Sequence, residues 1–173
     1  GDDIKAAKGA GYSVKLIAHA EFKDGRILAM VSPRFVPESD PLYGVSDVFN
    51  GISVDTDMLG KTMFYGRGAG KLPTASAVVA DVVEMAKHLD QNIPVEWSKE
   101  ELPLADYKKN EKRFFVRTEA DEAAVKAAFG EVELVHADGI SGEMGFVTGN
   151  MTEAAYEEKA AKLGKVLQMI RLA

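Results

Sequence analysis

Two spacings of apolar residues divide this chain into its elements. Apolar and polar residues alternate from position 12 onward, as they do in a strand with one buried face; the first alternating set is Val14, Leu16, Ala18, Ala20 and Phe22. Asp24-Gly25 is a strong signal for the tight turn of a hairpin. We therefore predict paired strands at 12–22 and 27–36, with further strands at 48–55 and 61–65.

Helical spacing begins after a glycine-rich stretch and continues to about Leu89. Apolar residues then recur every three or four positions along one stripe, namely at Ala75, Val78, Val79, Val82, Ala86 and Leu89. The stripe predicts a helix packed against a neighbouring element. Between 92 and 111 this periodicity fades, and Pro94, Pro103 and a charged cluster indicate a linker.

The last third of the chain has a regular succession of strand, helix, strand, strand, helix and strand. The predicted ranges are 113–118, 120–129, 131–137, 143–148, 152–163 and 165–172. This βαββαβ order is typical of a ferredoxin-like domain. The predicted fold class is therefore α+β, with a mixed sheet and packed helix in residues 1–91, a linker at 92–111 and a ferredoxin-like domain at 112–173.

Composition excludes several classes of partner. The 173 residues are 46% apolar, which is enough for a packed core, and 21 basic against 27 acidic residues give a net charge of −6, which repels nucleic acid. There is no cysteine, which favours a reducing compartment, and no apolar run approaches the ~20 residues of a membrane helix. We expect a cytoplasmic protein without nucleic-acid or membrane partners. Because the chain begins with Gly1 rather than Met, we also expect it to be part of a longer protein.

The most specific local feature is the stretch 65–77, which holds Gly66, Gly68 and Gly70. Turn amides followed by a helix N-terminus can hold an anion or a cofactor. A Walker loop would require Ser or Thr where Leu72 stands. A Rossmann fingerprint would require a helix directly after the glycines, which Pro73 is expected to delay. It would also require a second strand ending in an acidic residue, which the sequence does not indicate. Close packing or a plain turn thus remains as good an interpretation as ligand contact.

No complete set of catalytic or metal-binding groups is predicted. The histidines His19, His88 and His136 lie on three different elements without ligand-like spacing. Asp55 and Asp57 flank a turn, where carboxylates commonly cap backbone amides. We therefore predict no catalytic residue and no metal site in this chain.

Three stretches resemble the homoserine dehydrogenase family. They are VPESDPL at 36–42, VFNGI at 48–52 and MFYGRGAGKLPTASAVVAD at 63–81. Together with residues 3–16 they extend the resemblance over about the first 90 residues. The βαββαβ tail resembles the ACT regulatory domain that many bacterial members carry.

The resemblance implies an enzyme that interconverts aspartate semialdehyde and L-homoserine with NADP or NAD. The family's nucleotide-binding domain and catalytic lysine precede the passage with which this chain starts, so the resemblance implies an inactive C-terminal portion. The glycine turn is the part that carries over: Gly70 corresponds to the residue that touches the nicotinamide cofactor, and Gly66 and Gly68 shape its approach.

The resemblance also implies a homodimer, a small-molecule substrate for the parent enzyme and an amino-acid effector at the ACT-like domain. The segment 118–124 lacks the glycine of the usual Asp-x-x-Gly effector turn, which argues against threonine feedback there. The alternative hypothesis is a stand-alone module for amino-acid binding and dimerisation.

Overall fold

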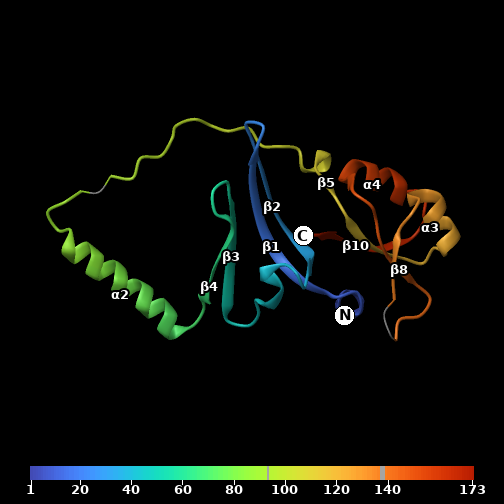
Figure 1. The fold of residues 1–173 in the computed structure, drawn as a ribbon, viewed down its shortest axis with the longest axis horizontal. Helices are drawn as coiled ribbons and strands as arrows, with labels where there is room; N and C mark the ends of the chain where they lie inside the picture. Colours follow the sequence, from blue (N-terminus) through green and yellow to red (C-terminus); the bar gives the residue numbers. More distant parts are fainter. Residues whose placement is uncertain (93, 137–138) are drawn as a thin grey trace. The chain divides into compact units, whose positions relative to one another are not determined.

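The computed structural model describes residues 1–92, 94–136 and 139–173 (Figure 1). The chain forms two compact units, one of residues 1–43 with 102–173 and the other of residues 44–101. These units divide the chain at different positions from the 92–111 linker expected from the sequence. The first strands fold together with the tail of the chain, and residues 103–105 hydrogen-bond to Ile27 on one of those strands.

The larger unit is built on a six-stranded mixed sheet. β1 (Tyr12–Lys23) and β2 (Arg26–Pro37) form the predicted antiparallel hairpin, in register from Tyr12↔Pro37 to Lys23↔Arg26. Both turn residues between them have positive φ, 52° at Asp24 and 70° at Gly25, as a two-residue hairpin turn requires. The sheet order is β1-β2-β10-β6-β8-β7.

The C-terminal part confirms the predicted βαββαβ order. Its elements are β6 (Phe114–Thr118), α3 (Glu122–Phe129), β7 (Glu133–Val135), β8 (Met144–Val147), α4 (Glu153–Ala160) and β10 (Val166–Leu172). The antiparallel order β10-β6-β8-β7 is the ferredoxin-like arrangement. The hairpin joins this sheet through a short parallel pairing, Arg171↔Arg34 and Leu172↔Phe35. Short elements complete the unit: η2 (Tyr107–Lys109), and β5 (Glu111–Lys112) paired with β9 (Met151–Thr152).

Alternating residues of the strands supply a core on each face of this sheet. Phe114 and Val116 face the helices α3 and α4, whose side chains Val125 and Tyr156 are buried against them. On the opposite face the core includes Phe35 and Phe115, together with Ala6 and Ala7 of α1 (Asp2–Gly9).

The smaller unit contains β3 (Phe49–Thr56), β4 (Gly60–Arg67) and α2 (Lys71–Lys87), and η1 (Pro41–Gly44) leads into it. The strands pair as a separate two-stranded sheet instead of joining β1 and β2. None of the described residues of 44–101 is buried. The predicted packing of α2 is therefore wrong within this chain, since the apolar stripe is exposed: Val78 57%, Val79 60% and Val82 59% on α2, and Leu89 81% just beyond its end.

No helix in the described ranges has the length and apolarity that crossing a bilayer demands.

Candidate functional site: the glycine turn and a cavity at the sheet

The three predicted site glycines lie together between β4 and α2, in the smaller unit. All three are exposed. Gly66 is the penultimate residue of β4 and pairs with Asn50 of β3. A Cβ at Gly66 would meet nothing within 4 Å, whereas a Cβ at Gly68 would overlap the side-chain amide nitrogen of Asn50.

Gly70 is the N-cap of α2 and has a φ of 113°. L side chains rarely adopt this conformation, so the position favours glycine. The carbonyl of Gly70 accepts hydrogen bonds from the Thr74 amide (3.2 Å) and from Thr74 Oγ1 (2.8 Å). These bonds tie the turn to the first turn of the helix.

Pro73 does not delay the helix, contrary to the prediction. α2 begins at Lys71, and Pro73 lies in its first turn, where amides have no intrahelical acceptor and a missing N–H costs little. The turn thus joins a strand directly to a helix. The other objection to a Rossmann fingerprint holds, since the described residues 88–101 contain no strand.

Aromatic contacts position the strand that leads into the turn. The rings of Phe49 and Tyr65 stack with centroids 4.9 Å apart, and the Arg67 guanidinium lies 5.1 Å from the centroid of the Phe49 ring. The first turn of α2 has no acidic residue and begins with Lys71. This end of the unit therefore offers helix amides and positive charge, which suit an anionic or electron-rich ligand.

The larger unit contains a cavity of about 270 Å³ that sequence analysis did not find. It is lined from α1, β6, β7 and β8, and includes Glu122 and His136. Arg117 in its wall donates to Asp3 Oδ1 at 2.5 Å and to Glu143 Oε2 at 3.2 Å. These three charges come from distant parts of the sequence, so no local motif could have indicated them.

In the described ranges, no three His, Asp or Glu side chains gather as a possible metal-binding group. His19 and His88 lie in different units, on β1 and directly after α2. His136 lines the cavity beside Arg117.

Comparison with known proteins gives concordant matches. The family model for homoserine dehydrogenase matches residues 1–83, a range that includes the whole glycine turn. The homoserine dehydrogenase of Corynebacterium glutamicum is 39% identical over 127 residues, covering 69% of this chain, and that of Mycobacterium bovis is 35% identical over 180 residues, covering 90%. The chain is thus similar to homoserine dehydrogenases over nearly its whole length.

A solved homoserine dehydrogenase from Thiobacillus denitrificans matches 99% of the chain, with a TM-score of 0.79 and 25% identity. The chain spans only part of these homoserine dehydrogenases: 28% of the Corynebacterium protein, 41% of the Mycobacterium protein and 45% of the Thiobacillus structure. The tail beyond residue 83 lies outside the family-model match, but most of it is covered by the match to the Mycobacterium protein and nearly all of it by the match to the Thiobacillus structure.

Proposed function

We propose that this chain is the C-terminal portion of an NADP- or NAD-dependent homoserine dehydrogenase, an oxidoreductase that interconverts L-aspartate 4-semialdehyde and L-homoserine in threonine and methionine biosynthesis. The observation that carries the proposal is the glycine turn, which lies within the range matched by the family model. In this proposal the parent enzyme is a cytoplasmic homodimer. The chain alone is inactive, because hydride transfer needs a bound nucleotide and a positioned acid.

The exposed surface of the smaller unit supports this proposal. More than half of the Thiobacillus protein has no counterpart in this chain. Large apolar patches are normally covered, and the smaller unit exposes the stripe of α2 together with Ile52 and Phe64 of its hairpin. In the parent enzyme, we propose, the remaining part of the protein covers these residues and carries the nucleotide to the glycine turn.

The Gly70 conformation defines what the turn does in this proposal. A glycine at φ 113° leaves the backbone without a side chain at the start of α2, so a nicotinamide ring is able to approach the main chain closely. Gly66 and Gly68 keep the approach clear. Asn50 occupies the space beside Gly68.

A test of inactivity is direct. The purified chain, supplied with homoserine and NADP or NAD, is expected to give no increase in absorbance at 340 nm. Turnover by this chain alone would contradict the proposal.

A chimera tests the role of the turn. The matching segment of the Corynebacterium homoserine dehydrogenase, 39% identical, is replaced by this chain, and the chimera is expected to be active. In it, Gly66→Ala raises the KM for the cofactor at least about tenfold. The substitution fits the protein sterically, because a Cβ there meets nothing within 4 Å and the backbone is not left-handed, so a loss reports on the ligand.

The matched control is Gly149→Ala, at a glycine that is also open and is not left-handed. It lies in the ferredoxin-like part of the chain and is expected to leave the KM unchanged. Equal KM values for the two variants would mean that the glycine turn does not contact the cofactor.

The alternative function, amino-acid binding by an ACT-like tail, rests on a different observation. The cavity beside Arg117 brings Asp3, Glu143 and His136 together with apolar wall residues, and such a mixture of charged and apolar groups suits a small amino acid. Calorimetry with threonine, lysine and methionine tests it, with Glu143→Gln as the variant that abolishes the heat. Absence of heat with all three amino acids would leave the tail a structural domain.

A further inference from the structure

One arginine of the larger unit is buried without its hydrogen bonds. Arg34 of β2 is 3% exposed. Its Nε and Nη2 atoms have no hydrogen-bond partner among the described residues. Because a guanidinium stays charged inside proteins, burying one without partners is costly. Something must complete this site for the sheet to be stable.

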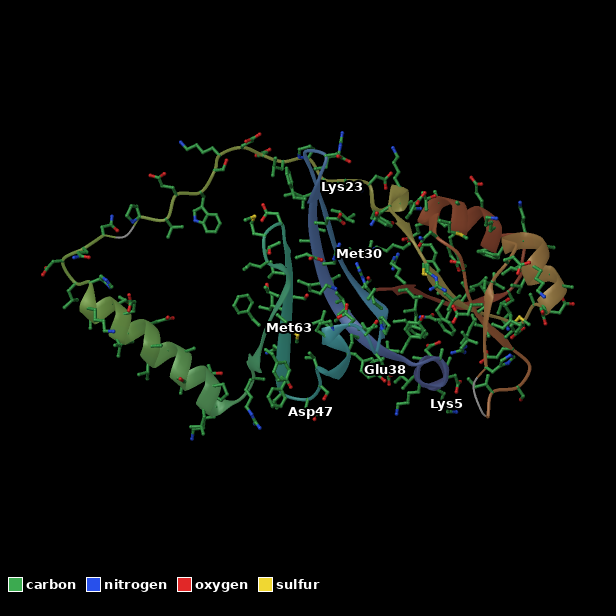
Figure 2. All side chains as sticks on the ribbon, viewed as in Figure 1. Lys5, Lys23, Met30, Glu38, Asp47 and Met63 are labelled. Carbon is green, nitrogen blue, oxygen red and sulfur yellow. The ribbon has the colours of Figure 1, made fainter. Side chains whose placement is uncertain are left out.

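The surroundings of Arg34 are rich in positive charge. A small cavity of about 10 Å³ is lined by Arg34, Lys112, Arg171, Glu153 and Asn110 among others, and Met30, labelled on β2 in Figure 2, also lines it. The charge of Glu153 is already matched, since its carboxylate accepts from Arg171 Nε at 2.9 Å and from Arg171 Nη2 at 2.5 Å. Among the residues that the structure describes, no buried carboxylate is left to pair with Arg34 or Lys112.

Among the described residues, the carboxylate that acts on Lys112 is that of Glu21, and it is too exposed to balance the pair. Glu21 attracts Lys112, but its side chain is 44% exposed and lies beside His19, with 3.6 Å between Glu21 Oε2 and His19 Nε2. Charges facing solvent are well screened. The excess of buried positive charge around the cavity therefore persists.

The titration behaviour of three groups is consistent with this excess. Burial, followed by the charge of Arg34, lowers the pKa of both Lys112 and His19. Burial, followed by the charge of Arg171, lowers the pKa of Arg34 itself. Each of these groups would be stabilised in its charged form by a negative ion placed among them.

We propose that Arg34, Lys112 and Arg171 bind one small monovalent anion, of which chloride is the abundant example. The cavity has room for about one water-sized particle, so phosphate and carboxylate ligands are too large for it. The chain's own atoms cover Arg34 almost entirely, so a side chain from another protein is unable to reach it. An anion satisfies both the donors and the charge, whereas a water molecule satisfies only the donors.

The position of this site gives the anion a structural role. Arg34 and Arg171 are paired residues at the short parallel contact that attaches the hairpin to the ferredoxin-like sheet. Within the part of the chain that the structure describes, two residue pairs and a hydrogen bond from the Ala173 amide to the Phe35 carbonyl (2.9 Å) make this contact. A bound anion would add charge-assisted hydrogen bonds across it, and the attachment of the hairpin would then depend on the halide concentration.

The test compares chloride with gluconate, a bulky anion, at constant ionic strength in the 173-residue chain. When chloride rises to about ten times its dissociation constant, the melting temperature is expected to rise by about 3–5 °C. Arg34→Gln abolishes this dependence. The matched control is Arg26→Gln, at an exposed arginine of the same strand, which keeps it. Equal melting temperatures in chloride and gluconate, or equal loss in both variants, would overturn the proposal.

A second measurement needs no variant and remains decisive if Arg34→Gln fails to fold. Crystals of the unaltered chain soaked in bromide are expected to show an anomalous peak within about 3.5 Å of Arg34 Nε and Nη2, since halides lie slightly farther from donors than oxygen does. A site filled by water alone, or bromide found only elsewhere, would refute anion binding at Arg34.

Discussion

The two units of this chain use the same kinds of element and reach opposite outcomes. In the larger unit, strands and helices bury aromatic and branched residues on both faces of one sheet. In the smaller unit, a well-formed hairpin and a 17-residue helix bury none of the residues described. Amphipathic pattern thus specifies an element, but stability requires a partner surface.

The residues that stabilise the fold and the residues proposed to contact the cofactor lie in different units. The larger unit contains the core and the buried charges, while the glycine turn lies in the unit without a core. Under the proposed function, that unit acquires its partner only in the longer enzyme. The following predictions test how sharply the two units differ, beginning with the largest effect.

Phe115→Ala is expected to destabilise the chain by about 3–5 kcal/mol, since it empties a fully buried site. Phe115 is 0% exposed and stacks on Phe35 with ring centroids 4.4 Å apart. The matched change in the smaller unit, Phe64→Ala, removes a ring that is 68% exposed and loses less than about 1 kcal/mol of cross-strand contact. Urea unfolding followed by circular dichroism measures both. Equal losses would mean that the smaller unit shares the core.

Glu153→Ala is expected to cost about 3 kcal/mol, because it leaves the Arg171 guanidinium charged and poorly exposed. The control is Glu122→Ala. Each glutamate is the first residue of an eight-residue helix whose N-cap side chain makes a capping bond. The Glu122 side chain is 48% exposed beside Lys126, against 9% for Glu153, so its loss costs only about 0.3–0.5 kcal/mol. The urea midpoints of the two variants measure both losses. Similar midpoints would contradict a buried ion pair between Glu153 and Arg171.

Tyr156 makes the larger unit sensitive to alkali. Burial and the nearby Glu153 carboxylate raise its pKa to about 12, against an unfolded value near 10. The unfolded chain therefore loses this proton first, and the contribution, present below pH 10, is lost as pH rises towards 12. Its full size is up to about 2–3 kcal/mol.

Tyr156→Phe keeps the ring contacts with Phe114 and Phe129 but has no proton to lose. The unaltered chain is expected to lose more stability than this variant between pH 10 and 12, as followed by urea unfolding at several pH values. Parallel pH curves would show that Tyr156 ionises as readily in the folded chain as in the unfolded one.

The sequence predicts well what depends on neighbouring residues. Alternation around Asp24-Gly25 predicted the hairpin, and the spacing of the tail predicted every element of the ferredoxin-like order. Contacts between residues far apart in the sequence could not be predicted. Nothing local to Arg34 indicates that it meets Arg171, because that pairing depends on which strand lies next to β2.

In the candidate site, too, local features could be predicted and long-range contacts could not. The sequence located the glycine turn, but the contact between Gly68 and Asn50 depends on the register of β3 and β4. Pro73 was misjudged because the first turn of a helix tolerates proline. The apolar spacing located the stripe of α2, but it could not show that this chain leaves the stripe exposed. The cavity beside Arg117 is lined by residues of five separate elements and has no local signature.

The smallest expected effect on stability is that of a substitution in the exposed apolar stripe of α2. Val82→Ser is expected to change the stability of this chain by less than about 0.5 kcal/mol, because Val82 is 59% exposed and valine and serine have similar helix propensities. The control is Val125→Ser in α3, where the residue is 0% exposed and a hydroxyl enters the core, at a cost of more than about 2 kcal/mol. Thermal unfolding of the two variants measures the contrast.

The same Val82→Ser change in the active chimera sharpens the comparison between the units. If the rest of the enzyme covers α2, as the proposed function requires, the substitution removes a buried methyl contact there and lowers the melting temperature of the chimera. The loss of stability would then rise from near zero in the isolated chain towards the cost of more than about 2 kcal/mol expected for Val125→Ser. An effect that stays near zero in the chimera would mean that this face of α2 remains in solvent, and the helix would then present only its N-terminal glycine turn to the cofactor.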